Sequence, residues 1–256
     1  MVASRFRRTD MWIVIPICLW VLAMITTPII HWTADEAAFH AMITIGVLMQ
    51  AGATVTALVR ATGFGSMLRI VLPILLLAWL AEFIGSHTGF PFGKYTYTDI
   101  LQPQVGGVPL LIPVAWLMML PSSWAVADLI IKDRGFPAPW PAHLARAAVA
   151  ALAFTTWDLF LDPQMVIWGL WHWASPGIYF GIPLTNYLGW LLVSFLITLL
   201  LAPANLPSSP LLVIYAITWF LTFFGQLFFW NLPGPALVGF TSMGGILFWL
   251  YRRSRK

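Results

Sequence analysis

Residues 157–163 read Trp-Asp-Leu-Phe-Leu-Asp-Pro and place two carboxylates, Asp158 and Asp162, four residues apart in an apolar stretch. The whole chain of 256 residues is 60% hydrophobic and 9% charged, a composition that excludes a soluble domain of this size. A charged Asp at the centre of a membrane helix costs about 3 kcal/mol by insertion scales, so such residues usually face the protein interior and have a function. The stretch therefore indicates an integral membrane protein with buried acids.

The apolar segments are long enough to cross a bilayer. A helix needs about 20 apolar residues to cross a hydrocarbon core of about 30 Å. Reading the chain at that length gives eight candidate spans, approximately residues 11–30, 37–59, 67–86, 109–131, 143–161, 186–203, 210–230 and 235–251. We predict an all-α, polytopic membrane helical bundle of about eight transmembrane helices, with residues 1–256 forming a single domain.

Basic residues are distributed unevenly between alternate connections. If the N-terminus is cytoplasmic, all of the 13 lysines and arginines except Lys94 fall on the cytoplasmic side, as the positive-inside rule requires. We predict a multi-pass protein of the cell membrane with both termini in the cytoplasm. Because the basic residues gather at the termini and in short connections, the net charge of +4 does not indicate binding to nucleic acid.

Pro163 interrupts the fifth apolar segment. Proline has no backbone N–H to donate, and it disfavours helical geometry at the preceding residue, so the span is expected to stop near Leu161. Asp162 followed by Pro163 is typical of an N-cap and the first position of a new helix. We predict a broken or re-entrant segment here, with residues 163–174 at the outer surface or returning into the membrane.

The two outer connections, residues 87–108 and 163–174, are rich in aromatic side chains. Trp and Tyr are enriched at membrane interfaces, and an interfacial belt would explain any one of them. The chain's 15 tryptophans nevertheless exceed what anchoring requires. This surplus favours an aromatic-lined apolar cavity that binds a flat hydrophobic ligand and stabilises a transient cation.

Glu82 and Asp158 are the strongest candidates for a catalytic acid. Each lies about one turn inside the outer end of its span among apolar neighbours. Such surroundings favour a protonated carboxyl, which can act as a general acid, although a structural hydrogen bond to another helix is the competing explanation. Asp99 can equally be a solvated turn residue, and an i,i+4 ion pair with Lys132 explains Asp128.

Several cofactor chemistries have no signature in the sequence. The five histidines show no clustered iron-binding pattern, and there is no Walker A motif, dinucleotide-binding glycine fingerprint or GxSxG elbow. A single cysteine, Cys18, provides neither a disulfide framework nor a thiolate metal site. We expect acid chemistry on an apolar substrate, with no metal and no cofactor.

Three segments of the chain resemble the membrane carotenoid hydratases, a family that includes bisanhydrobacterioruberin hydratases and bacterial γ-carotene 1′,2′-hydratases. They are residues 82–116 (EFIGSHTGFPFGKYTYTDILQPQVGGVPLLIPVAW), 157–163 (WDLFLDP) and 179–190 (YFGIPLTNYLGW). The first two and last two spans resemble that family only in hydrophobicity. The resemblance implies addition of water to the C1,2 double bond of an acyclic carotenoid end group, which gives a tertiary alcohol.

The residues can be assigned roles in that reaction. Asp158, with Glu82 as the second choice, would protonate the alkene. A water held by Asp162, Asn186 or Asp99 would be deprotonated as it attacks. Aromatic faces would stabilise the cation. The predicted substrate-binding residues are Trp157, Tyr95, Tyr97, Trp171, Asn186 and Tyr187.

The expected partners are a carotenoid substrate within the bilayer, membrane lipids and other enzymes of carotenoid biosynthesis. Two other functions fit the same residues. A lycopene-type cyclase would protonate a related end group and let an internal alkene capture the cation, whereas a carotenoid or lipid carrier would bind without chemistry. The sequence leaves open whether the substrate has forty or fifty carbons and whether one or both ends react.

Overall fold

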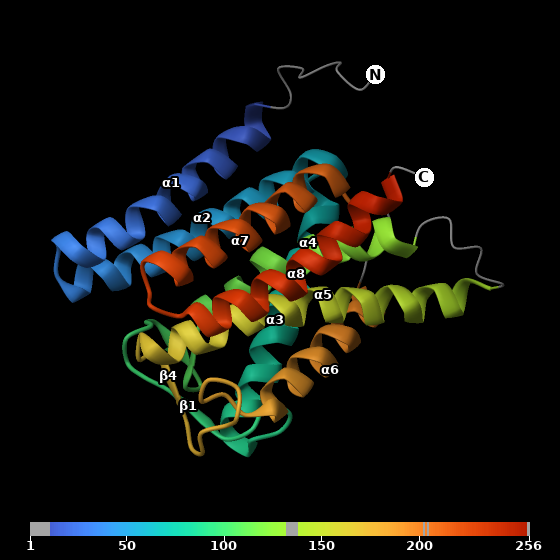
Figure 1. Cartoon of the computed structure of the whole chain (residues 1–256). Coiled ribbons are helices and arrows are strands. Elements are labelled where there is room, and N and C mark those ends of the chain that lie inside the picture. The colour runs from blue at the N-terminus through green and yellow to red at the C-terminus, as the bar shows by residue number, and fades with distance from the viewer. Residues whose placement is uncertain (1–10, 132–137, 202, 204, 255–256) are drawn as a thin grey trace.

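The computed structural model describes residues 11–131, 138–201, 203 and 205–254. Over these residues the chain forms eight long helices, each apolar enough to cross a membrane. They are α1 (Met11–Thr33), α2 (Glu36–Thr62), α3 (Phe64–Thr88), α4 (Leu111–Ile131), α5 (Pro139–Ile167), α6 (Leu184–Leu201), α7 (Ser208–Phe228) and α8 (Pro233–Ser254) (Figure 1). The predicted multi-pass, all-α bundle is confirmed.

Helix α4 occupies the centre of the bundle. It packs against α2, α3, α5 and α7, and most of its side chains are buried. Helix α1 packs chiefly against α2 and exposes large apolar side chains such as Trp12, Leu22 and Ile29. In a bilayer these side chains face lipid tails, which are as apolar as the side chains themselves.

Helix α5 runs without interruption through Pro163 and ends at Ile167. The predicted stop near Leu161 and the broken or re-entrant segment are therefore wrong. Asp162 lies inside the helix and caps nothing. Its side chain consequently lies on the same face of α5 as that of Asp158, which is one helical turn earlier.

The backbone around Pro163 is satisfied by side chains from other parts of the chain. A proline in a helix leaves the carbonyl four residues earlier without its usual N–H partner. That carbonyl belongs to Leu159, and the hydroxyl of Tyr179 donates to it at 2.9 Å. The next carbonyl, of Phe160, accepts from Nε2 of Gln226 at 2.6 Å. Such replacement donors are how membrane helices tolerate proline.

Two short antiparallel ladders lie at one end of the bundle. Strand β1 (Tyr95–Tyr97) pairs with β4 (Trp171–Trp173), and β2 (Gln104–Val105) pairs with β3 (Val108–Pro109). The β1–β4 ladder joins the two aromatic connections, which are far apart in sequence. Figure 1 shows these strands at the end of the bundle opposite to the start of α1 and the end of α8.

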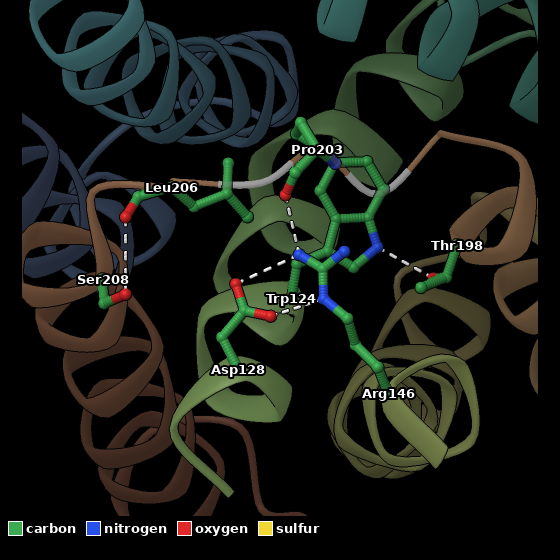
Figure 2. Close-up of polar contacts among 7 residues, drawn as sticks. All are labelled: Trp124, Asp128, Arg146, Thr198, Pro203, Leu206 and Ser208. Atoms are coloured by element: carbon green, nitrogen blue, oxygen red, sulfur yellow. Dashed lines mark hydrogen bonds and ion pairs between the residues drawn. The ribbon is translucent and has the colours of Figure 1, made fainter. Parts of the chain in front are cut away.

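An ion pair holds α4 and α5 together at the other end of the bundle (Figure 2). Arg146 donates to both carboxylate oxygens of Asp128 and, at 2.8 Å, to the backbone carbonyl of Pro203. The sequence pattern predicted Lys132 as the partner of Asp128, but Lys132 lies outside the described residues. The partner that the structure gives to Asp128 is a residue of the next helix.

Candidate active site

Three buried carboxylates converge at the end of the bundle that carries β1 and β4. Glu82 comes from α3, and Asp158 and Asp162 come from α5. Their exposed fractions are 4%, 0% and 2%, respectively. Glu82 and Asp162 line the same cavity, and Asn186 bridges Asp162 to Asp158, so the three acids belong to one site.

Glu82 is surrounded by hydrogen-bond donors. The hydroxyls of Tyr95 and Tyr97 donate to its Oε2 at 2.5 and 2.8 Å, and the indole Nε1 of Trp116 donates to its Oε1 at 3.1 Å. Hydrogen bonds from donors to a carboxylate are charge-assisted and favour its ionised form. The three donors therefore offset part of the cost of burying Glu82 in its ionised form.

The two tyrosines of β1 remain donors at all physiological pH values. Burial raises the pKa of the Tyr95 and Tyr97 hydroxyls well above the ordinary value, and the nearby charge of Glu82 raises it further. A hydroxyl in such a site does not ionise near neutral pH. Both protons therefore stay available to Glu82.

Asn186, in the first turn of α6, bridges the two aspartates. Its Nδ2 donates to Oδ2 of Asp158 at 2.8 Å and also to Oδ2 of Asp162. The indole Nε1 of Trp171 donates to the other oxygen of Asp162 at 2.6 Å. Oδ1 of Asp158 is buried and has no hydrogen-bond partner among the residues that the structure describes. Two carboxylates that share one amide in an apolar interior are most stable with a single proton between them.

The β1–β4 ladder connects the two halves of the site. Tyr97, which donates to Glu82, is the cross-strand partner of Trp171, which donates to Asp162. Their rings lie 5.9 Å apart, edge to face. The register of one short ladder thus fixes the placement of donors to both carboxylate groups before any ligand binds, which is the preorganisation that an active site needs.

Glu82 and Asp162 line an apolar cavity of about 490 Å³. The cavity continues from these acids to Gln50 and Thr218, which lie midway along α2 and α7. The prediction of an aromatic-lined cavity is confirmed, because the wall near the acids is formed by Tyr95, Tyr97, Trp116, Trp157, Trp171, Trp173 and Trp190.

The predicted site residues differ in their relation to this cavity. Glu82, Asp162, Trp157, Tyr95, Tyr97, Trp171 and Asn186 all line it. Asp158 is fully buried behind the wall, bonded to Asn186. The hydroxyl of Tyr187 is buried and has no hydrogen-bond partner in the described part of the chain, and its ring packs edge to face on Tyr179, with ring centroids 5.2 Å apart. Asp99 is exposed in the connection between α3 and α4, and the fold does not bring it to the cavity wall.

Three tryptophans of the site were not singled out from the sequence. Trp116 donates to Glu82 and stacks on Trp190, with ring centroids 4.7 Å apart. Trp173 borders the cavity, and its ring centroid lies 5.2 Å from that of Tyr95. Trp116 carried a usable signal, because it lies in the second turn of its span, deeper than an interfacial belt requires.

Comparison with known proteins agrees with the resemblance found in the sequence. Residues 39–246 match the family described as carotenoid biosynthesis protein. A bisanhydrobacterioruberin hydratase from Haloarcula japonica is 32% identical over 118 residues, which are 46% of this chain and 38% of that relative, so the match covers well under half of the relative's length. No solved structure matches the chain. Because the family match covers most of the chain and includes all three carboxylates, the chain belongs to the carotenoid biosynthesis protein family.

Proposed function

We propose that this chain is a carotenoid hydratase, which adds water to the C1,2 double bond of an acyclic carotenoid end group. The observation that carries the proposal is the combination, at one aromatic cavity, of Glu82 with its three hydrogen-bond donors and an aspartate pair bridged by Asn186. Membership of the family supports a carotenoid as the substrate class. The name of the relative supports hydration as the reaction.

The Asp158–Asp162 pair supplies the proton. Asp162 lines the cavity, so it is the member that contacts the alkene, while Asp158 lies behind it and shares the proton. Transfer of the proton to C2 forms a C–H bond, consumes the π bond and leaves a tertiary cation at C1. The proposal keeps Asp158 in the proton-donating unit, as the sequence predicted, and makes Asp162 its contact with the substrate.

Glu82 completes the addition. Its negative charge stabilises the cation, and the faces of Trp157 and Trp190 add cation–π stabilisation. A water molecule attacks C1, and Glu82 accepts a proton from it as the C–O bond forms. The proton then passes back to the aspartate pair, so the reaction consumes one water and regenerates both acids without an external oxidant or reductant.

The depth of the site suits both reactants. Glu82 is six residues from the end of α3, and Asp162 is five residues from the end of α5, so each lies within about two turns of a helix end. A polyene chain can remain in the hydrocarbon layer while its end group reaches this depth. Water arrives from the nearby interface without crossing the centre of the bundle.

We also propose that the site lies at the non-cytoplasmic face. The start of α1 and the end of α8 lie at the opposite end of the bundle (Figure 1), and the distribution of Lys and Arg favours cytoplasmic termini. Labelling of single cysteines introduced next to the termini, with a reagent that does not cross membranes, tests this orientation. If the reagent labels these cysteines in intact cells, the termini are outside and the proposed orientation is wrong.

Expression in cells that accumulate lycopene, γ-carotene or bisanhydrobacterioruberin tests the proposed reaction. Extracted pigment is expected to gain the mass of one or two water molecules, as measured by mass spectrometry. A product of unchanged mass with a new ring would assign a cyclase instead. A carotenoid that copurifies with the protein and keeps both its mass and its structure would assign a carrier.

A further inference from the structure

The cavity opens to the side of the bundle between α1 and α7. Ile25, Ile29 and Trp32 of α1 and Phe220 and Phe224 of α7 all line it. The same five side chains are 40–60% exposed. Because they border the cavity and the surroundings at once, they form the rim of an opening. All five residues lie inside apolar spans, in the last three turns of α1 or α7. In a bilayer most of this rim therefore faces acyl chains.

The hydrogen-bond donors of the two polar side chains midway along the cavity are already engaged. Nε2 of Gln50 donates to Thr218 Oγ1 at 3.0 Å, and Thr218 Oγ1 in turn donates to the carbonyl of Ile214 at 2.9 Å. These donors therefore point into the wall, and most of the other side chains that line the cavity are apolar. The path from the rim to the carboxylates therefore fits a hydrocarbon chain better than a lipid headgroup, which needs several polar partners.

The cavity is too small to enclose a long polyene. A volume of about 490 Å³ lies within the range that holds a drug-sized ligand. A forty-carbon polyene is comparable in length to the hydrocarbon core of about 30 Å. If one end group reaches Asp162, the rest of the chain must leave the cavity.

We propose that the gap between α1 and α7 is a lateral portal through which an acyclic isoprenoid chain enters from the bilayer. Its tail stays in the portal while its end group contacts Glu82 and Asp162. The inference rests on the proposed function for the chemistry at the inner end and deepens it by fixing the direction of the substrate. It also assigns α1 and α7 the task of recognising the chain.

Gly46 of α2 provides a way to obstruct this path. It lines the cavity, and a Cβ at this position would have Met24 Sδ, at 3.9 Å, as its nearest neighbour. Gly52 of the same helix is exposed, and a Cβ there would meet nothing within 4 Å. Gly46→Phe and Gly52→Phe therefore make a matched pair, with one ring added inside the cavity and the other outside. Ile29→Trp narrows the rim itself and provides a second test if Gly46→Phe does not fold.

The test compares two hydrocarbons that share the reacting end group, lycopene and an acyclic isoprenoid of two isoprene units. Purified protein in lipid nanodiscs is supplied with each. We expect Gly46→Phe and Ile29→Trp to hydrate lycopene about tenfold more slowly or worse, and the short compound at a rate much closer to that of the wild type. Gly52→Phe should behave as the wild type towards both. Equal rates for lycopene in all four proteins would overturn the portal.

Binding separates failure of the portal from failure of the proposed function. If the wild type hydrates neither compound, the function is wrong, but the absorption spectrum of bound lycopene still reports entry. The portal then predicts a spectral shift with the wild type and Gly52→Phe that is lost with Gly46→Phe and Ile29→Trp. Native mass spectrometry that finds a phospholipid in the wild-type cavity, undisplaced by lycopene, would show that the opening takes acyl chains instead and would refute the proposal.

Discussion

Replacement of Glu82 by glutamine removes the proposed anion while keeping the size of the side chain. In the wild type, the Tyr95 and Tyr97 hydroxyls point at one oxygen and the Trp116 indole at the other. Glutamine has one oxygen and one NH₂ group. An indole N–H can only donate, whereas a hydroxyl can rotate and accept. We therefore expect the amide to turn its oxygen to Trp116 and its NH₂ to the tyrosines.

The expected loss of activity is much larger than the loss of stability. Exchanging charge-assisted hydrogen bonds for neutral ones changes the free energy of unfolding by about 1–2 kcal/mol, because all three partners of Glu82 can still be satisfied. Losing the group that accepts the proton of water lowers the rate by roughly 10²–10⁴-fold. The Glu82→Gln variant should therefore accumulate in the membrane and add almost no water.

The assay uses cells that accumulate lycopene and compares pigment mass at equal amounts of membrane protein. Hydration by Glu82→Gln at more than a tenth of the wild-type rate would refute the role of Glu82. A second readout uses purified protein in D₂O. Because the aspartate pair is intact, the variant should still place deuterium on the end group as the cation forms and decays. Absence of deuterium would instead make Glu82 the proton donor.

Three further substitutions test other parts of the structure. Asp162→Asn should abolish both hydration and deuterium incorporation in D₂O while the protein stays folded, and retention of either would remove Asp162 from the proton-donating unit. Tyr179→Phe leaves the Leu159 carbonyl without its donor and should lower the unfolding free energy by about 1–3 kcal/mol; an unchanged thermal midpoint in detergent would show that this carbonyl needs no partner. Arg146→Met leaves Asp128 unpaired and should cost about 1–3 kcal/mol, part of which the added change Asp128→Leu should restore; if the double variant is less stable than the single one, the reasoning about this pair fails.

The number and position of the spans could be predicted from the sequence because the length of an apolar segment is read directly from its residues. The course of α5 could not. The rule that proline ends a helix depends on the fate of one carbonyl, and the donor to that carbonyl, Tyr179, is twenty residues away in the chain. The sequence next to Pro163 does not predict that Tyr179 is this donor.

Part of the site could be predicted, because acidic residues are rare inside apolar spans. Glu82 and Asp158 stood out among apolar neighbours, as did the aromatic connections. The sequence could not predict that Asp162, and not Asp158, lines the cavity. The position of Asp162 depends on α5 continuing as a helix through Pro163. The link between the connections was also hidden, since Tyr95–Tyr97 and Trp171–Trp173 are three-residue strands, too short for their alternation to specify a partner or a register.

The short ladder between β1 and β4 constrains how this protein can change. The paired strands hold Tyr97 at Glu82 and Trp171 at Asp162, so a shift of either strand would disturb the proposed proton donor and the proposed proton acceptor together. Substitutions in α1 should alter the choice of substrate at the least cost to the site, because α1 borders the cavity and supplies neither of those donors. Under the two proposals, the reaction and the choice of substrate therefore depend on different parts of the chain.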